Sequence, residues 1–264
     1  MTNLNKRMPV IFIGHGSPMN AIEKTIFSEG MEAVGRRLPK PKSVLCISAH
    51  WETRGTFVTA MENPETIHDF GGFPHELYEV EYPAPGNPEL AKRISSLVKT
   101  TQVELNKDWG LDHGCWSVLK YLFPKADIPI VELSMDYTKP ASFHYALAKE
   151  LIPLRDEGVL IVASGNIIHN LRLIDWRNLS VPDTGYDWAV KVHRDILQKV
   201  KEGNHQSLLG YDNLEREYRM AVPAPDHYLP LLYVLALQNQ EDKLEVFNES
   251  IVGGSLDMTS LLLE

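Results

Sequence analysis

The chain has 264 residues, of which 44% are hydrophobic and 23% are charged, and this composition excludes an intrinsically disordered protein. Its formal net charge of −9 argues against nucleic acid as a partner. No run approaches the ~20 apolar residues of a transmembrane helix, so we expect no membrane partner and a cytoplasmic location. We expect residues 1–264 to form one domain, and the sequence carries no signal for an oligomeric state.

Short runs rich in β-branched residues alternate with longer stretches of helical character. The first half predicts strand 10–13, helix 22–37, strands 43–48 and 56–61, helix 88–98 and helix 115–122. The second half predicts strand 128–134, helix 140–155, strand 159–163, helices 187–201 and 226–236, and closing strands 244–247 and 255–263. This order predicts an α/β fold, a single domain with a central, mostly parallel sheet covered by helices on both faces.

Residues 63–88 contain five prolines and three glycines, which predicts a long ordered loop with one short strand at 77–82. Loops of this length are often functional. An aromatic and proline cluster lies in this segment, and we interpret it first as packing within the loop: Phe70, Phe73, Pro74 and Tyr78. The alternative is a substrate-binding role, for which Phe73 and His68 are the candidates.

Three of the ten histidines follow predicted strands. His15 comes directly after the first strand, His50 after the second, and His169 shortly after the strand at 159–163. In open α/β sheets, ligands gather at the carboxyl ends of parallel strands, so these side chains are expected to converge. The simpler interpretation of each is a hydrogen-bonded structural histidine. Convergence is the hypothesis on which a metal site depends.

His113 and His227 each lie in a turn-like segment ahead of a predicted helix. The positive end of a helix disfavours imidazolium, which keeps a histidine neutral and able to bind a metal or accept a proton. The other histidines carry weaker signals. His75 in the long loop is expected to face solvent, and three more, in helical or polar surroundings, are predicted to lie on the surface: His144, His193 and His205.

Other motifs exclude several chemistries. The segment Gly14-His15-Gly16-Ser17-Pro18 is not a GxGxxG dinucleotide fingerprint, and neither Ser17 nor Ser48 lies in a GxSxG nucleophile elbow. Cys46 and Cys115 belong to no CxxC pair, so both are predicted to be free thiols in a reducing compartment.

Six ordered motifs, spread over nearly the whole chain, give the sequence a family resemblance. They are Gly14-His15-Gly16-Ser17-Pro18, Ser48-Ala49-His50-Trp51, residues 68–74 with 82–86, Asp112-His113-Gly114, residues 163–166 with His169-Asn170, and residues 226–231. With these motifs the chain resembles the class III extradiol ring-cleavage dioxygenases, and within them the DOPA 4,5-dioxygenase branch. The resemblance implies one extradiol dioxygenase-like catalytic domain.

The resemblance also implies roles for five histidines. His15, His50 and His227 correspond to metal ligands, His169 to the acid/base histidine beside the catechol, and His113 to a residue close to the oxygen and substrate site. Relatives that cleave protocatechuate use a glutamate as the third ligand, but no glutamate here falls in an equivalent motif. Fe(II) is the metal expected for activity. Three imidazoles also suit zinc, so Zn(II) can occupy the isolated protein.

The implied reaction is extradiol opening of a small catechol such as L-DOPA with O2, giving a muconate semialdehyde. This chemistry requires a base that removes a hydroxyl proton and an acid that protonates the opening ring, and His169 suits both steps. Two alternatives stay open, a zinc-dependent hydrolase and a non-catalytic metal-binding protein on the same fold. Oxygen uptake with a catechol distinguishes a dioxygenase from the zinc-dependent hydrolase. Failure of an iron-loaded sample to turn over any catechol favours the non-catalytic metal-binding protein.

Overall fold

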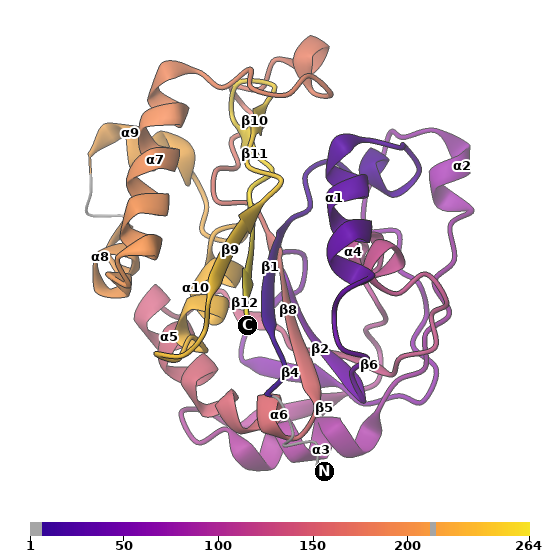
Figure 1. Ribbon diagram of the computed structural model, residues 1–264. Helices are drawn as coiled ribbons and strands as arrows, with labels where there is room; N and C mark the ends of the chain where they lie inside the picture. Colours follow the sequence, from indigo (N-terminus) through magenta and orange to yellow (C-terminus); the bar gives the residue numbers. More distant parts are fainter. Residues whose placement is uncertain (1–6, 212–214) are drawn as a thin grey trace.

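The computed structural model describes residues 7–211 and 215–264, and its centre is a six-stranded sheet (Figure 1). The strand order is β6 (Ile130–Glu132), β2 (Ser43–Ser48), β8 (Val159–Gly165), β1 (Val10–Gly14), β12 (Ser260–Leu263) and β9 (Leu244–Phe247). The first four strands are parallel, and the last two are antiparallel to their neighbours. The predicted mostly parallel sheet is confirmed.

The helices cover both faces of this sheet, which explains why its central strands are continuously apolar. On one face, α1 (Ile26–Gly35) and α4 (His113–Leu122) pack over Ile11 and Ile13 of β1. On the other face, α5 (Ala141–Glu150) and α10 (Leu229–Ala236) pack over Val10 and Phe12. Alternate residues of one strand therefore enter two separate cores.

The remaining elements surround this framework. The helices are η1 (Pro18–Ala21), α2 (His75–Tyr78), α3 (Pro88–Leu97), α6 (Ile152–Asp156), η2 (Trp176–Asn178), α7 (Asp187–Lys201), α8 (His205–Leu209) and α9 (Arg216–Ala221). Three short strand pairs lie outside the main sheet: β3 (Glu52–Thr53) with β7 (Met135–Asp136), β4 (Thr56–Thr59) with β5 (Val103–Asn106), and β10 (Ile251–Val252) with β11 (Leu256–Asp257). Within the described ranges, no helix is long and apolar enough to cross a membrane.

The predicted strand at 77–82 is wrong. The segment begins inside the short helix α2, which follows Pro74, and residues 79–82 join no strand. The side chain of Tyr82 is instead buried, and its hydroxyl donates a hydrogen bond to the carbonyl of Phe123 at 2.9 Å. Tertiary contacts to α4 determine the path of this segment.

Several other boundaries differ from the sequence prediction. Helix 140–155 divides into α5 and α6 at Leu151, two residues before Pro153, because proline cannot donate within a continuing helix. The first helix begins only at Ile26, after an N-cap at Thr25. The strand predicted at 56–61 pairs outside the main sheet, and the strand predicted at 255–263 is interrupted between β11 and β12.

Two histidines predicted to be on the surface are buried, which corrects that assignment. The Nδ1 atom of His144 is hydrogen-bonded to the Tyr233 hydroxyl at 3.0 Å, and that of His193 donates to Asp257 at 2.8 Å. Both side chains lie on the apolar faces of their helices, α5 and α7. Polar neighbours in the sequence do not reveal which face of a helix a residue occupies. Cys46 and Cys115 are free thiols, as predicted.

Candidate metal centre

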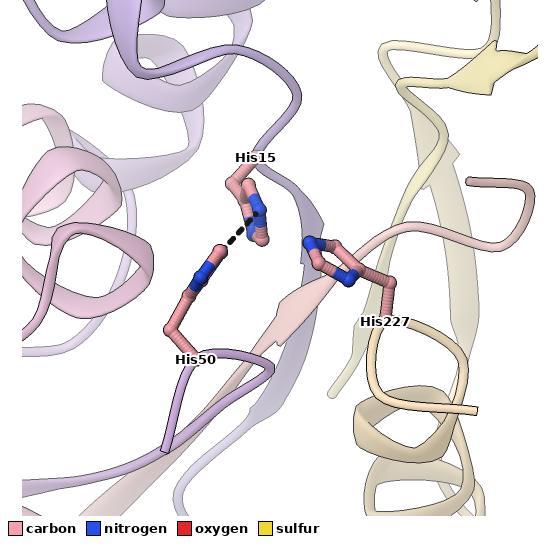
Figure 2. Close-up of side chains that lie close together, drawn as sticks. All are labelled: His15, His50 and His227. Carbon is pink, nitrogen blue, oxygen red and sulfur yellow. Dashed lines mark hydrogen bonds between the residues drawn. The ribbon is translucent and has the colours of Figure 1, made fainter. Parts of the chain in front are cut away.

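Three histidines predicted as metal ligands lie around one point at the carboxyl ends of the central strands (Figure 2). His15 directly follows β1, His50 follows β2 by one residue, and His227 lies just before α10. Their ligand atoms all fall within 4.8 Å of one another. The Nε2 atoms of His15 and His50 are 3.2 Å apart, close to the ~3.0 to 3.4 Å expected between two ligands with metal bonds of ~2.1 Å.

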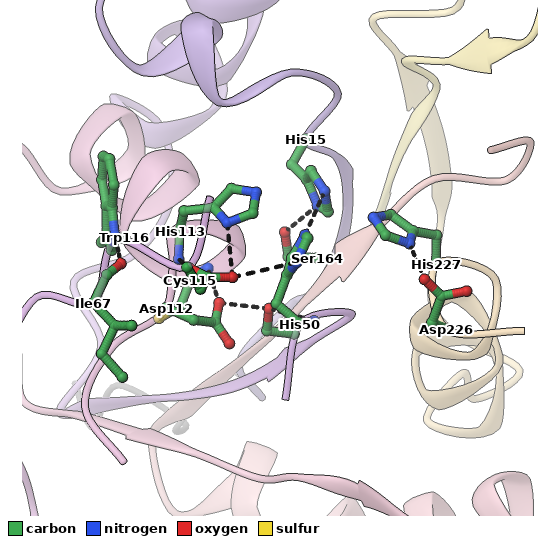
Figure 3. A network of polar contacts seen from close by, with 12 residues as sticks. His15, His50, Ile67, Asp112, His113, Cys115, Trp116, Ser164, Asp226 and His227 are labelled. Carbon is green, nitrogen blue, oxygen red and sulfur yellow. Dashed lines mark hydrogen bonds and ion pairs between the residues drawn. The ribbon is translucent and has the colours of Figure 1, made fainter. Parts of the chain in front are cut away.

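Each of these rings has a second partner at Nδ1 (Figure 3). The Nδ1 of His15 is hydrogen-bonded to the Ser164 hydroxyl at 2.9 Å, and that of His227 donates to the Asp226 carboxylate at 2.6 Å. The Nδ1 of His50 lies 3.4 Å from the Asp69 carboxylate. Metal-binding histidines usually hold such a partner on the nitrogen that does not bind the metal. The arrangement leaves Nε2 of His15 and His50 at the centre.

Burial determines the charge of the cluster. Burial, followed by repulsion from neighbouring histidines, lowers the pKa of His15 and of His227 well below the ordinary value. The same two causes lower the pKa of His50 to about 3. Neutral imidazoles are the form that binds a metal. A buried set of three neutral nitrogen ligands therefore fits a divalent ion such as Fe(II) or Zn(II).

Two glycines of the sequence motifs allow this convergence. A Cβ atom on Gly114 would lie 2.4 Å from the Ser48 hydroxyl and 2.9 Å from a ring carbon of His50. A Cβ atom on Gly165 would lie 2.3 Å from the carbonyl oxygen of His227. Real Cβ contacts are never this short, so only glycine permits these segments to approach the ligands.

The two other predicted site histidines complete a cluster of five. His113 is the first residue of α4, with its ring centroid 3.9 Å from that of His50. His169 lies parallel to His227, with ring centroids 3.5 Å apart and planes 4° apart. Burial lowers the pKa of His169, and the nearby Asp226 partly opposes this effect. His169 is therefore a neutral base at the edge of the centre.

His68 and Phe73 both pack around Phe70. The Nε2 of His68 is 3.0 Å from the carbonyl oxygen of Val80, and its ring contacts Phe70. Phe73 also packs against Phe70, with ring centroids 5.5 Å apart. Phe70 in turn contacts the ring of His113 at 5.4 Å. The aromatic cluster thus packs within the loop, as the first interpretation holds, and also contacts the histidines through Phe70.

Sequence reasoning missed three residues that contact the ligands: Asp69, Asp226 and Ser164. Asp69 and Asp226 each stand directly beside a histidine in the sequence, which was the available signal. Two further groups that could hold a metal include these carboxylates: Asp69 with His50 and His113, and Asp226 with His169 and His227. Because both carboxylates already accept hydrogen bonds from histidine nitrogens, the three-histidine group is the stronger candidate for the metal.

Comparisons with known proteins agree with this geometry. The sequence profile of the family described as "Catalytic LigB subunit of aromatic ring-opening dioxygenase" matches residues 9–256. A protein from Escherichia coli K12 named "4,5-DOPA dioxygenase extradiol" is 46% identical over 97% of this chain and 94% of its own length. A Beta vulgaris protein of the same name is 36% identical over 94% of both chains. The crystal structure of an uncharacterized Escherichia coli K12 protein superposes with a TM-score of 0.82 at 39% identity, covering 98% of this chain and all of that one.

Proposed function

This chain belongs to the LigB family of aromatic ring-opening dioxygenases, and we propose that it opens the ring of a small catechol, L-DOPA in the first place, with O2 to give a muconate semialdehyde. It is an extradiol aromatic ring-opening dioxygenase. The observation that supports the proposal most is the convergence of three neutral histidines, with two further histidines at their edge. We take residues 1–264 as one catalytic domain.

We assign the metal to His15, His50 and His227, and we propose Fe(II) as the active ion, with Zn(II) as an ion that the isolated protein also binds. Fe(II) would supply the redox chemistry that lets triplet O2 react with a singlet catechol. The carbonyl of His227 accepts a hydrogen bond from the backbone of Asn166 at 2.8 Å, and this contact fixes the third ligand relative to the end of β8.

We assign proton transfer to His169, and we propose that His113 contacts the bound substrate or O2. The neutral ring of His169 is able to take a proton from a catechol hydroxyl and to return it as the ring opens. The Nδ1 of His113 donates to Asp69 at 2.9 Å, so its Nε2 is the nitrogen left to contact a substrate hydroxyl. Phe73 and His68 are proposed substrate contacts on the aromatic loop, acting with Phe70.

L-DOPA is the proposed substrate because two relatives named "4,5-DOPA dioxygenase extradiol" are 46% and 36% identical to this chain over nearly its full length. The reaction partners are therefore the catechol and O2. We also propose a cytoplasmic location, which the two free buried thiols, Cys46 and Cys115, support because reducing compartments maintain such thiols.

The deciding experiment is oxygen consumption by metal-free protein reconstituted anaerobically with Fe(II). L-DOPA, caffeate and protocatechuate are supplied separately, and a yellow ring-opened product is followed by absorbance. We expect oxygen uptake and product in equal amounts, fastest with L-DOPA, and none from the zinc-loaded protein. Hydrolysis of an ester or amide by the zinc form, without oxygen uptake by the iron form, would favour a zinc hydrolase. Inertness of the iron form toward all three catechols would favour a binding protein.

A further inference from the structure

One carboxylate contacts both a proposed metal ligand and a histidine that is not a ligand. The Asp69 carboxylate accepts a hydrogen bond from the backbone N–H of His113 at 2.8 Å and one from its Nδ1 at 2.9 Å. The oxygen that accepts from Nδ1 of His113 also lies 3.4 Å from Nδ1 of His50. Asp69 is mostly buried, and its side chain is 16% exposed. It therefore connects the two rings, whose centroids are 3.9 Å apart.

We propose that Asp69 is a positioning residue that fixes the tautomer and orientation of His50 and His113 together. A carboxylate can only accept hydrogen bonds, so His113, which is hydrogen-bonded to Asp69 through Nδ1, carries its proton on that nitrogen. The same carboxylate oxygen lies 3.4 Å from Nδ1 of His50 and favours the same tautomer there. An imidazole with a single N–H that donates it from Nδ1 keeps a lone pair on Nε2. For His50 that lone pair serves the metal, and for His113 it serves the substrate or oxygen side. The inference rests on the proposed function of this site.

The loop that carries Asp69 is held firmly on both sides of His113. The backbone N–H of Ile67 donates to the carbonyl of Leu111 at 2.7 Å, and the Trp116 indole N–H donates to the carbonyl of Ile67 at 2.8 Å. Leu111 precedes α4 and Trp116 lies inside it, so both contacts tie the loop to the helix that begins at His113. These contacts hold segment 63–88 against α4 and fix the position of the Asp69 carboxylate relative to His113.

The test replaces the carboxylate with an amide of the same shape, Asp69→Asn. The amide NH2 group can donate to Nδ1 of His113 and so favours the Nε2–H tautomer. In metal-free protein, ¹⁵N NMR of the imidazoles distinguishes the two tautomers, with each ring assigned by comparison with His50→Gln and His113→Gln. We expect wild-type rings in the Nδ1–H form and a switch at His113 in the Asp69→Asn protein. Zinc affinity and kcat are each expected to fall ~10- to 100-fold, with a smaller change in KM.

Two further variants make the result specific. Asp108→Asn removes an equal charge from an exposed position and is expected to leave tautomers, zinc affinity and kcat unchanged. Asp69→Glu keeps an acceptor-only group and is expected to keep the Nδ1–H tautomer of His113. Urea unfolding of Asp69→Asn separates a positioning defect from a general loss of stability.

The proposal is overturned if both rings of Asp69→Asn keep the Nδ1–H tautomer, or if its zinc affinity equals that of Asp108→Asn. These readouts need no catechol and no iron. If the wild-type iron form opens no catechol, the proposed function fails, whereas the tautomer and zinc measurements still decide the role of Asp69.

Discussion

His169 stands in parallel contact with His227, yet its backbone is held independently of the proposed metal. Its backbone N–H donates to the carbonyl of Ala221 at 3.0 Å, and its backbone forms an isolated antiparallel β-bridge with Leu256. The backbone of His169 therefore needs no contact with a metal to hold its position. Stacking on His227 places it directly beside the centre, at 3.5 Å between ring centroids.

Replacing His169 with Ala should separate proton transfer from metal binding. We expect the variant to bind zinc or iron at one equivalent, because none of the proposed ligands is removed, while kcat falls by ~100-fold or more. Metal content by mass spectrometry and oxygen uptake with L-DOPA measure the two effects. The exposed His75→Ala serves as the matched control and should retain full activity. Unchanged kcat in the His169 variant would remove its assigned role.

The residues that sequence reasoning found and missed differ in a physical way. His15 and His50 were predicted because they lie at the ends of buried strands, and the carboxyl ends of parallel strands lie at one edge of the sheet. Asp69 and Ser164 were missed because their function depends on which nitrogen of a distant histidine they face. A strand pattern predicts where a backbone ends but not the partner of a side chain.

At the scale of elements, the end of β8 and the start of α10 fit together only through Gly165. Its missing side chain lets the strand lie against the carbonyl of His227, and that carbonyl also accepts the Asn166 N–H at 2.8 Å. A Cβ atom placed on Gly165 would also lie 3.1 Å from Cγ of Pro230. The position of His227, the proposed third ligand, therefore depends on the packing of one strand against one helix.

The substitution Gly165→Ala should displace His227. We expect a loss of ~1 to 3 kcal/mol in the free energy of unfolding, because the site has no room for a methyl group, and weaker zinc binding in addition. Urea unfolding and zinc titration give the two values. Gly210→Ala is the control, since no atom of residues 7–211 or 215–264 lies within 4 Å of its added Cβ beyond its chain neighbours. Equal zinc affinity in the two variants would contradict the link between β8 and the ligand.

The elements themselves were predictable where their sequence pattern alone requires burial. The central strands β1, β2 and β8 are apolar at nearly every position because helices cover both faces. The short strand β5 was missed because its pairing with β4 is decided by tertiary contacts. For the same reason residues 77–82 were wrongly predicted as a strand.

At the scale of the whole molecule, His193 links helix α7 to the carboxyl-terminal region. Burial lowers its pKa, but hydrogen bonds and charge from Asp257 and Glu249 outweigh burial, so the pKa is raised. Both carboxylates lie on the segment that leads into β12, at 2.8 and 3.3 Å from the ring nitrogens. Through both ring nitrogens His193 thus joins two parts of the chain.

The raised pKa predicts a pH-dependent stability. A folded pKa above the unfolded value of ~6.5 contributes stability that is fully present below about pH 6.5 and is lost as pH rises through the folded pKa. We expect the difference in urea midpoint between wild type and His193→Gln to be largest at about pH 6 and to shrink at alkaline pH. A difference that is constant across this range would show that His193 contributes no charge-dependent stability.

Metal binding should stabilise the whole molecule, because the three proposed ligands come from positions 15, 50 and 227 and connect both ends of the chain across the sheet. An ion that binds only the folded state at about 1,000 times its Kd adds ~4 kcal/mol. For a chain of this size, that amount raises Tm by roughly 8 to 16 °C. Differential scanning calorimetry of metal-free protein with and without Zn(II) measures the shift.

The variant His15→Ala supplies the comparison that makes this shift informative. It removes one ligand whose Nδ1 contact to Ser164 is separate from the other two ligands, so the metal-free fold should persist. We expect its Tm to respond little to Zn(II), and its metal content after dialysis to fall well below one equivalent. A full zinc-induced shift in His15→Ala would mean that the ion stabilises the protein from another site, since a three-ligand centre without one ligand cannot hold zinc with wild-type affinity.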